Sequence, residues 1–318
     1  MGGLSDPYSS NTQHAHCPVT AANQVQKAKV MSADLENPPV LVGVDGSESA
    51  LAAVRFAAAA AAHRHAPLHI IDSIPAPADF GPGVALEQID YDSYRAQATT
   101  ALEAAREAAA TAAAPIDAID ITTELAEAPP IPVLRDRSKN ARLLVVGTHG
   151  LGVFSRSILG SVSTALARHA ACPVAVVPVD VEHADGPVVV GVDGSPCSVR
   201  AVEIAFDEAA HRGAELVAVH TWSEFFRYDS RAEMQQEAEE LLAESLAGYG
   251  EQYPEVPVRR VVVEDRPARR LLEVGANARL IVVGSHGRGG FAGMTLGSVS
   301  QAVLHGATVP VIIARSQS

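Results

Sequence analysis

Two glycine-rich turns are the parts of this sequence whose residue types and spacing best suit ligand binding. Each has a Gly-x-x-Gly pair after an apolar run and, nine residues further on, a Gly-Ser pair that opens a helical pattern. The positions are Gly147, Gly150, Gly160 and Ser161, and again Gly284, Gly287, Gly297 and Ser298. Glycine lets the backbone turn sharply and approach a bulky anion. A helix start adds free N–H groups and the positive end of a dipole.

A single Gly-x-x-Gly pair is weak evidence, because most such turns only reverse the chain. The full spacing is much rarer, and its occurrence twice at corresponding positions predicts one phosphate site in each turn. Hydroxyl groups add further hydrogen-bond donors there, at Ser161, Ser163, Ser298 and Ser300. The histidines inside the turns, His149 and His286, could act as bases. We interpret them instead as loop residues whose backbone matters.

The turns belong to a longer internal repeat. Four blocks recur in the same order: VLVGVDG at 40–46 and VVVGVDG at 188–194, LLVVGTHG at 143–150 and LIVVGSHG at 280–287, LGSVS at 159–163 and 296–300, and ACPVAVV at 171–177 and ATVPVIIA at 307–314. They predict a first repeat, 39–180, and a second repeat, 187–316, after a disordered leader, 1–38. The first repeat carries about 11 extra residues, which we place in the Pro/Gly-rich stretch Pro75–Gly83.

Strand and helix patterns alternate within each repeat. Strands are expected near 40–44, 68–72, 117–124, 143–146 and 174–177, and in the second repeat near 188–192, 216–219, 258–263, 280–283 and 309–313. A helix capped by Ser198 is expected after the first strand of the second repeat. Continuous apolar strands separated by helices predict an α/β fold with two doubly wound, five-stranded parallel sheets. Ligands of such sheets bind at the carboxyl ends of the strands.

Composition narrows the possible functions. The 318 residues carry a formal net charge of −13, a pI near 5.3 and only three lysines, so binding to a nucleic-acid backbone is not expected. Three widely spaced cysteines argue against a disulfide framework, and Cys172 is interpreted as a buried thiol. No signal peptide or membrane span is recognisable, which predicts a cytoplasmic protein. Met31 is an alternative start, and the tract His14, His16 and Cys17 is read as a solvated tail rather than a metal site.

At the glycine turns the sequence resembles the universal stress protein family, in its tandem, ATP-binding form, from about residue 39 to 315. The family motif is Gly, two residues, Gly, nine residues, Gly, then Ser or Thr, and both repeats match it. The resemblance implies a Rossmann-like fold with strand order 3-2-1-4-5, ATP as ligand, and Mg²⁺ brought in on its phosphates. It also implies that the last strands of the two repeats pair within the chain, and two chains are expected to associate further as a homodimer.

The resemblance also implies roles for individual residues. Those lining the adenosine are Gly43, Asp45, Gly191 and Asp193, with Ser73 and Thr221 touching adenine. Those wrapping the phosphates are Gly147, Thr148, His149, Gly150, Leu151, Gly152 and Val153, and Gly284, Ser285, His286, Gly287, Arg288, Gly289 and Gly290. Those closing the two sites are Gly160, Ser161, Val162, Ser163, Gly297, Ser298, Val299 and Ser300. Arg288 and Arg156 occupy non-equivalent loop positions, and each either grips a γ-phosphate or is a surface residue.

Three hypotheses about the function remain, each from a different class of protein: a sensor, an enzyme and a scaffold. The sequence contains no P-loop lysine motif and no kinase signature, and none of its three lysines is near either turn, so fast phosphoryl transfer is not expected. We favour an ATP-binding sensor of stress or growth arrest with at most slow hydrolysis. The alternatives are a nucleotide-dependent enzyme and a chaperone-like scaffold with vestigial sites. The sequence leaves open which stress and partner are involved, and whether the nucleotide is ATP, ADP or a cyclic form.

Overall fold

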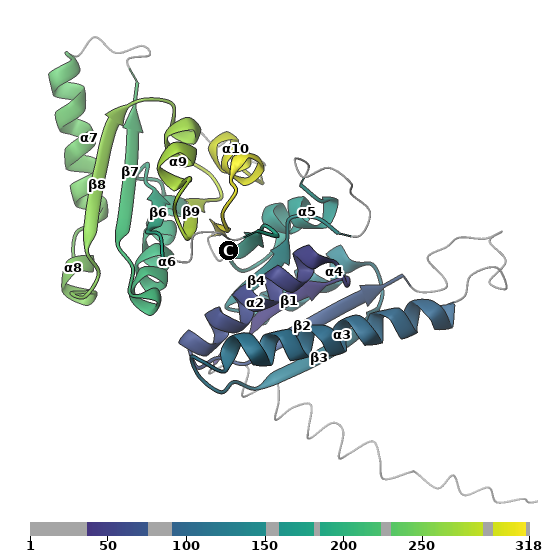
Figure 1. Cartoon of the computed structure of the whole chain (residues 1–318). Coiled ribbons are helices and arrows are strands. Elements are labelled where there is room, and N and C mark those ends of the chain that lie inside the picture. Colours follow the sequence, from purple (N-terminus) through teal and green to yellow (C-terminus); the bar gives the residue numbers. More distant parts are fainter. Residues whose placement is uncertain are drawn as a thin grey trace, which may run out of the picture. The chain divides into compact units, whose positions relative to one another are not determined.

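The computed structural model describes residues 37–75, 91–150, 159–180, 185–223, 230–288 and 295–315 (Figure 1). The first repeat contains β1 (Val40–Val44), α2 (Glu48–His63), β2 (Leu68–Ile74), α3 (Tyr91–Ala113), β3 (Ile121–Glu127), α4 (Pro130–Arg137), a short 3-10 turn (Ser138–Asn140), β4 (Leu143–Gly147), α5 (Ser161–His169) and β5 (Val174–Val177). Almost all of the predicted leader and most of Pro75–Gly83 lie outside the described residues.

The second repeat follows the same order. It contains β6 (Val188–Gly191), α6 (Pro196–Arg212), β7 (Leu216–Trp222), α7 (Arg231–Ser245), α8 (Tyr249–Gln252), β8 (Val258–Glu264), α9 (Pro267–Gly275), β9 (Leu280–Gly284), α10 (Ser298–Gly306) and β10 (Val311–Ala314).

All ten strands form one mixed sheet in the order β3-β2-β1-β4-β5-β10-β9-β6-β7-β8. Each repeat contributes a parallel half with the predicted order 3-2-1-4-5. The halves join where β5 and β10 pair antiparallel, with Val176 opposite Val311 and Val174 opposite Ile313. The predicted pairing of the two last strands within one chain is therefore confirmed.

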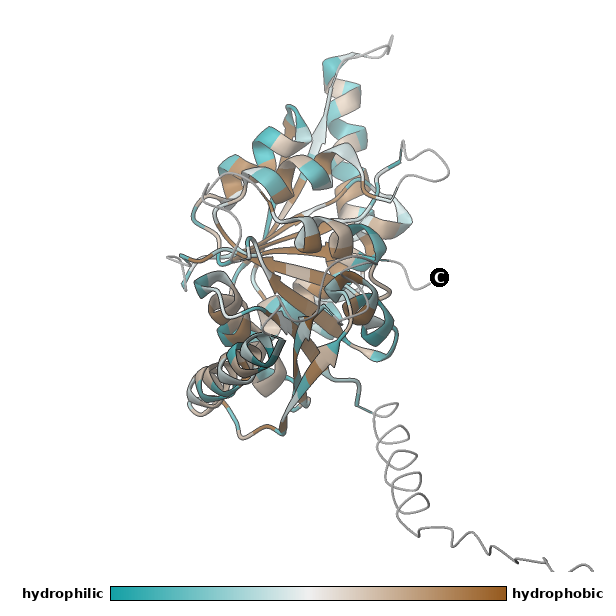
Figure 2. Ribbon diagram, turned by 90° about the vertical axis from the view of Figure 1, so that its right-hand side faces the viewer, coloured by the Kyte–Doolittle hydropathy of each residue, from teal (hydrophilic) through white to brown (hydrophobic). Residues whose placement is uncertain are grey.

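Helices cover both faces of the sheet because its strands are apolar on both sides. One face packs against α2, α3, α6 and α7, and the other against α4, α5, α9 and α10. Figure 2 shows the strands as the most hydrophobic ribbons, between helices of mixed character. Cys172 belongs to the second of these layers at 1% exposure, as predicted, and burial raises the pKa of its thiol to about 12.

Some element boundaries differ from the sequence-based expectations. α6 begins at Pro196, and its N-cap is Ser195, whose hydroxyl accepts a hydrogen bond from the Ser198 N–H. The expectation that Ser198 caps this helix was wrong by three positions, because Pro196 suits the first turn of a helix. β3 begins at Ile121 rather than near 117, where Asp117 binds the Ala118 N–H locally. β10 likewise begins at Val311 rather than at 309.

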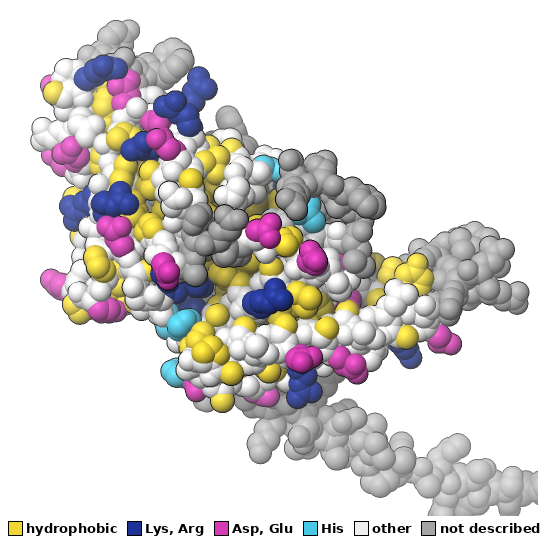
Figure 3. Space-filling model, viewed as in Figure 1, with side chains coloured by type: hydrophobic (Ala, Val, Ile, Leu, Met, Phe, Trp, Pro, Cys, Tyr) yellow, Lys and Arg dark blue, Asp and Glu magenta, His cyan; other side chains and the backbone are white. Residues whose placement is uncertain are grey.

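Charged side chains are dispersed on the surface that Figure 3 shows. Lys and Arg side chains on that face lie among Asp and Glu rather than in one basic patch. None of the helices in the described part of the chain is long and apolar enough to cross a membrane.

Replacing Phe206 with alanine tests the packing of the second repeat. Phe206 is 1% exposed, and its ring stacks on Tyr249 and Tyr253 at centroid distances of 4.7 and 5.6 Å. We expect Phe206→Ala to lower the free energy of unfolding by about 3–5 kcal/mol, because it removes a large side chain from a closed core. Denaturant unfolding followed by the fluorescence of Trp222, the only tryptophan, measures the change. Val199→Ala on the same helix, where Val199 is 51% exposed, is the control and should change it by less than about 0.5 kcal/mol. Equal effects of the two substitutions would contradict this account of the core.

Candidate functional site

In both repeats the predicted site residues meet at the carboxyl ends of neighbouring strands. β1 pairs with β4 and β6 pairs with β9, both in parallel. Parallel neighbours end at the same edge of the sheet, so the aspartate after the first strand faces the glycine turn after the fourth. Asp45 therefore lies beside the turn of Gly150, and Asp193 beside the turn of Gly287.

The second repeat contains a cavity of about 300 Å³ at this place. That volume is at the lower end of the range of small-molecule sites. The predicted residues that line it are Gly191, Asp193, Thr221, Gly284, His286, Gly287, Arg288, Gly297, Ser298, Val299 and Ser300. Ser285 is buried below the turn, and its hydroxyl lies 3.1 Å from Nδ1 of His286. Gly289 and Gly290 lie outside the described residues, as do Leu151, Gly152, Val153 and Arg156 of the first repeat.

Sequence analysis missed one wall of this cavity, which comes from α9. Pro267 and Leu271 line the cavity, and a Cβ at Gly191 would lie 3.0 Å from Cδ1 of Leu271. The first repeat has the same arrangement, since a Cβ at Gly43 would lie 2.8 Å from Cδ1 of Leu134. Both helices carry a proline followed four residues later by this leucine. That shared spacing was the signal that could have identified the wall.

The position of the second glycine in each turn requires glycine, because the backbone there passes close to the aspartate that follows the first strand. A Cβ at Gly287 would lie 2.5 Å from Oδ2 of Asp193, and one at Gly150 would overlap Oδ2 of Asp45. Oδ2 of Asp193 also accepts a hydrogen bond from the Arg288 N–H at 3.1 Å. The aspartate thus holds the turn while its carboxylate borders the cavity.

The same aspartates organise the loop that follows the first strand. Oδ1 of Asp45 accepts a hydrogen bond from the Ser47 N–H at 3.0 Å, and Oδ1 of Asp193 accepts one from the Ser195 N–H at 3.0 Å. The residue between each pair is a glycine with positive φ, +81° at Gly46 and +75° at Gly194. Only glycine adopts this conformation without strain, so the Asp-Gly-Ser sequence is a structural requirement.

Each loop is closed at its base by a backbone hydrogen bond. The Gly160 N–H donates to the Thr148 carbonyl at 2.8 Å, and the Gly297 N–H donates to the Ser285 carbonyl at 2.7 Å. These bonds bring the start of α5 or α10 next to the end of the fourth strand. The closed base therefore places the helix start beside the glycine turn, as the spacing predicted.

The third residue of each helix ties that helix to the strand. Ser163 Oγ donates to the Gly147 carbonyl at 2.6 Å, and Ser300 Oγ donates to the Gly284 carbonyl at 2.5 Å. Both serines are buried, whereas Ser161 and Ser298 are exposed at the helix starts and Val162 and Val299 are half-buried. The hydroxyl hydrogens of Ser163 and Ser300 are thus already engaged by the protein.

The helix starts themselves carry unused donors. Ser47 and Ser195 cap α2 and α6 with side-chain hydrogen bonds. Within the described residues, by contrast, no side chain caps α5 or α10, whose N-caps are Gly160 and Gly297. Uncapped N–H groups at the positive end of a helix dipole suit an anion.

The histidines of the two turns differ in their surroundings. The backbone N–H of His149 donates to Ser49 Oγ at 3.3 Å, and its buried Nε2 has no partner among the described residues. The carbonyl of His286 accepts a hydrogen bond from Ser195 Oγ at 3.3 Å. Each histidine thus has a backbone hydrogen bond to a serine of the neighbouring loop or helix, and its role at the site stays a prediction.

The second strands give the two sites different electrostatic surroundings. In β2, Asp72 is 4% exposed, and its burial raises the pKa to about 6, with a further contribution from the Asp45 carboxylate. The equivalent residue in β7 is His220, whose Nδ1 lies 2.7 Å from the Val192 carbonyl. Burial lowers the pKa of His220, as does Arg288, while Asp193 opposes this. The adjacent Ser73 donates its hydroxyl hydrogen to the Ala128 carbonyl, whereas Thr221 lines the second cavity.

A doubly wound sheet with a glycine turn beside a strand-one aspartate is typical of Rossmann-like α/β proteins. The model of the Universal stress protein family matches residues 36–178 and 186–315, and the chain belongs to that family. The universal stress protein Rv2005c of Mycobacterium tuberculosis (strain ATCC 25618 / H37Rv) is 45% identical over 300 residues, which cover 90% of this chain and 99% of that protein.

The fold is also that of a solved structure. A universal stress protein from Archaeoglobus fulgidus DSM 4304 has a TM-score of 0.63 and 23% identity, and covers 87% of this chain and 96% of that one. A universal stress protein solved in complex with cAMP is 29% identical, with a TM-score of 0.36, and covers 45% of this chain and 97% of that one.

The buried carboxyl group of Asp72 should make stability depend on pH. Because its pKa is raised in the folded state, folding is favoured below about pH 4, and that contribution is lost as the pH rises through about 6. We expect the free energy of unfolding of Asp72→Asn to rise by about 2 kcal/mol relative to that of the unchanged chain between pH 4 and pH 7.5. Unfolding free energies measured across this range test the sign. Asp120→Asn, at an exposed position before β3, is the control. A gain that is the same at both pH values would show that ionisation of Asp72 is not its cause.

Proposed function

We propose that this chain is an ATP-binding sensor that acts in stress adaptation or growth arrest and hydrolyses ATP slowly at most. The observation that carries the proposal is the cavity of the second repeat, where a glycine turn, an aspartate and an uncapped helix start converge. These are the elements that a nucleotide needs: room for a base, a carboxylate for ribose hydroxyls, and backbone donors for phosphates.

The polarity of the cavity suggests which end of the nucleotide each wall would hold. Leu271, Val219 and Thr221 form a mostly apolar side that suits the adenine ring. Asp193 suits the ribose hydroxyls. The N–H groups at the start of α10 and the hydroxyl of Ser298 suit the phosphates, because Ser300 is already bonded to the strand.

Magnesium would enter with the nucleotide. Among the described residues, no group of three or more His, Cys, Asp and Glu side chains is placed to hold a metal ion. Mg²⁺ commonly binds through substrate phosphates and water with few protein ligands. This chain would then contribute the site for the phosphates, and the ion would reduce their charge.

The two sites would differ in their grip on the phosphates. The Arg288 side chain lies over Gly194, where a Cβ would be 2.5 Å from its Nη2, and it borders the second cavity. The equivalent residue of the first repeat is Leu151. The second site therefore offers a cation to a polyphosphate, while the described part of the first site has the buried Asp72 near Asp45.

Replacing Gly287 separates the two sites. A side chain there would collide with the Asp193 carboxylate, and both residues line the cavity. We expect Gly287→Val to reduce the ATP stoichiometry measured by calorimetry from two per chain to one, with the remaining affinity unchanged. Gly250→Val in α8 is the matched control, because a Cβ at Gly250 has no heavy atom within 4 Å. Two retained sites in Gly287→Val would contradict the assignment of this turn.

The ligand itself is tested with the purified full-length chain. Mass spectrometry after heat denaturation should detect a co-purified adenine nucleotide. ATP at about 100 times its dissociation constant should stabilise the chain by about 2.7 kcal/mol per site. The absence of any thermal shift in millimolar ATP would contradict the sensor, and turnover above about 1 per second would favour an enzyme instead.

A further inference from the structure

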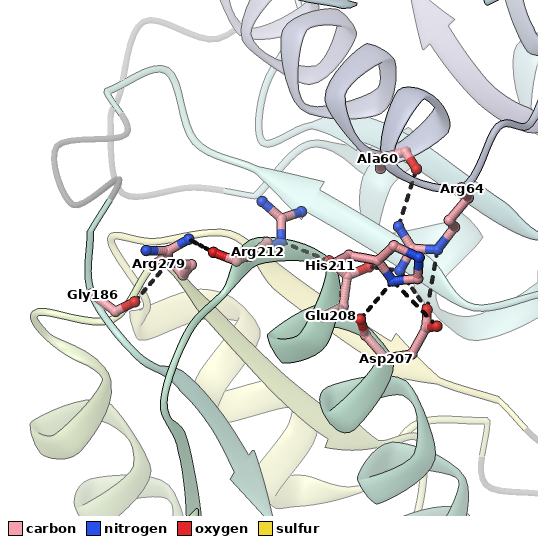
Figure 4. Close-up of polar contacts among 8 residues, drawn as sticks. All are labelled: Ala60, Arg64, Gly186, Asp207, Glu208, His211, Arg212 and Arg279. Carbon is pink, nitrogen blue, oxygen red and sulfur yellow. Dashed lines mark hydrogen bonds and ion pairs between the residues drawn. The ribbon is translucent and has the colours of Figure 1, made fainter. Parts of the chain in front are cut away.

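Two arginines at equivalent positions converge on one carboxylate where the repeats meet. Arg64 follows α2 and Arg212 ends α6, 148 positions apart, which is the offset of the repeat. Figure 4 shows Arg64 directed toward Asp207 and Glu208 of α6, with Arg212 at the end of the same helix beside Glu208. The site is distant in sequence from both glycine turns, and the proposed function does not use it.

The contacts across the junction are close, and the pair of Arg64 with Glu208 is shielded from water. Arg64 Nη2 lies 2.6 Å from Asp207 Oδ2 and 2.7 Å from Glu208 Oε1, while its Nη1 donates to the Ala60 carbonyl at 3.1 Å. The side chains of Arg64 and Glu208 are only 7% and 2% exposed. Removing one partner of a buried ion pair strongly destabilises the folded protein, because the other charge stays desolvated.

Arg212 completes the cluster from the second repeat. Its Nε donates to Glu208 Oε2 at 2.8 Å, and its guanidinium lies 4.9 Å from the ring centroid of Phe56 in the first repeat. Burial raises the pKa of Glu208, but Arg212 and Arg64 outweigh burial and bring the pKa to about 2. Glu208 is therefore ionised and neutralises arginines from both repeats.

The acidic residues occur in only one repeat. The positions of the first repeat that correspond to Asp207 and Glu208 are Ala59 and Ala60. A pairing of first with second repeat therefore places two arginines against two carboxylates. Two first repeats paired in the same way would bring two arginines together without an acid. Two second repeats would bring two arginines together with four acids.

The sequences of the strands that pair at the junction do little to determine which strand edge pairs with which. β5 reads VAVV and β10 reads VIIA, and both are buried and apolar. An apolar strand edge can pair with any similar edge, including its own copy in another chain. Charge is the feature of this junction that distinguishes the correct partner, as polar groups do in other specific interfaces.

We propose that the Arg64–Asp207–Glu208–Arg212 cluster determines the pairing of this sheet edge, admitting a second repeat beside a first repeat and excluding two like repeats. The partner that fits the first repeat at this edge is an apolar strand accompanied by a helix with two adjacent acidic residues about one turn before its end. In this chain that partner is the second repeat.

The test uses the full-length chain and hydrogen exchange followed by mass spectrometry. The double variant Asp207→Asn with Glu208→Gln leaves both arginines without a counter-ion. We expect exchange in peptides covering β5 and β10 to rise about tenfold or more, while β2 and β7 stay protected. Glu124→Gln is the control, because Glu124 pairs with Arg137 at 2.6 Å within the first repeat. It should leave β5 and β10 unchanged.

The direction in which a third substitution changes hydrogen exchange distinguishes charge pairing from packing alone. Arg64→Met alone should speed exchange at β5 and β10, because it removes the contacts of Asp207 and Glu208 with the first repeat and leaves the buried Glu208 with Arg212 alone. In the Asp207→Asn, Glu208→Gln background it should slow exchange, because it removes an unpaired buried cation. Effects of the same sign in both backgrounds would overturn the proposal, as would unchanged exchange in the double variant.

Sedimentation velocity tests the exclusion of like repeats. The double variant exposes two apolar edges whose neighbouring charges are both basic. We expect its mass to match that of the unchanged chain across a hundredfold range of concentration. Self-association beyond that of the unchanged chain would show that the edges pair regardless of charge, and would overturn the exclusion.

Discussion

The parallel pairing of β1 with β4, and of β6 with β9, is the constraint on which both sites depend. The chain reverses its winding direction at this pair, so the loops after the two strands leave toward opposite faces and a gap opens between them. Asp193 borders the gap from one side and Gly287 from the other, at a separation that leaves no room for a Cβ. The glycine spacing is therefore a consequence of strand order, since only this turn can pass so close to the carboxylate. The backbone bond from Gly297 to Ser285 then brings a helix start to the same gap.

A second constraint is the sheet edge that each repeat leaves open. β5 and β10 are apolar and lie beside the fourth strand of their own repeat, so each needs a partner on its other side. Antiparallel pairing of the two edges satisfies both at once and forms the ten-stranded sheet. The same pairing brings the ends of α2 and α6 together, which buries charge. Glu208 compensates two arginines there, so the packing of the helices and the pairing of the strands depend on each other.

Most of the fold could be predicted from the sequence, because apolar runs, glycine turns and their repetition are local signals. The strand order within each repeat and the pairing of the last strands followed from these signals and the family resemblance. Boundaries were less predictable. Ser195 and Ser198 both suit a cap, and the intervening Pro196 decides between them. The placement of Leu271 in the cavity wall depends on the packing of α9 against β6, and the proline–leucine spacing shared by the two repeats marks the residue without showing that packing.

Long-range electrostatics could not be predicted in the same way. Arg64 and Glu208 are 144 positions apart, and nothing in either helix alone shows that they meet. Asp72 likewise lies in an apolar strand, and its raised pKa depends on burial beside Asp45.

The two repeats share what the backbone requires and differ in the side chains around it. The Asp-Gly-Ser loops, the glycine turns and the serines at the third helix position have the same contacts in both halves. Those shared contacts support one class of ligand for both sites. The differences lie at residues next to predicted site residues. Asp72, before Ser73, corresponds to His220, and Leu151, after Gly150, corresponds to Arg288. Among the described residues, a buried carboxyl group lies near the first site and a cation borders the second. Under the proposed function, such inequivalent sites would let a tandem chain be half-loaded over a range of nucleotide concentration. Two identical copies with uncoupled sites would load both at the same affinity.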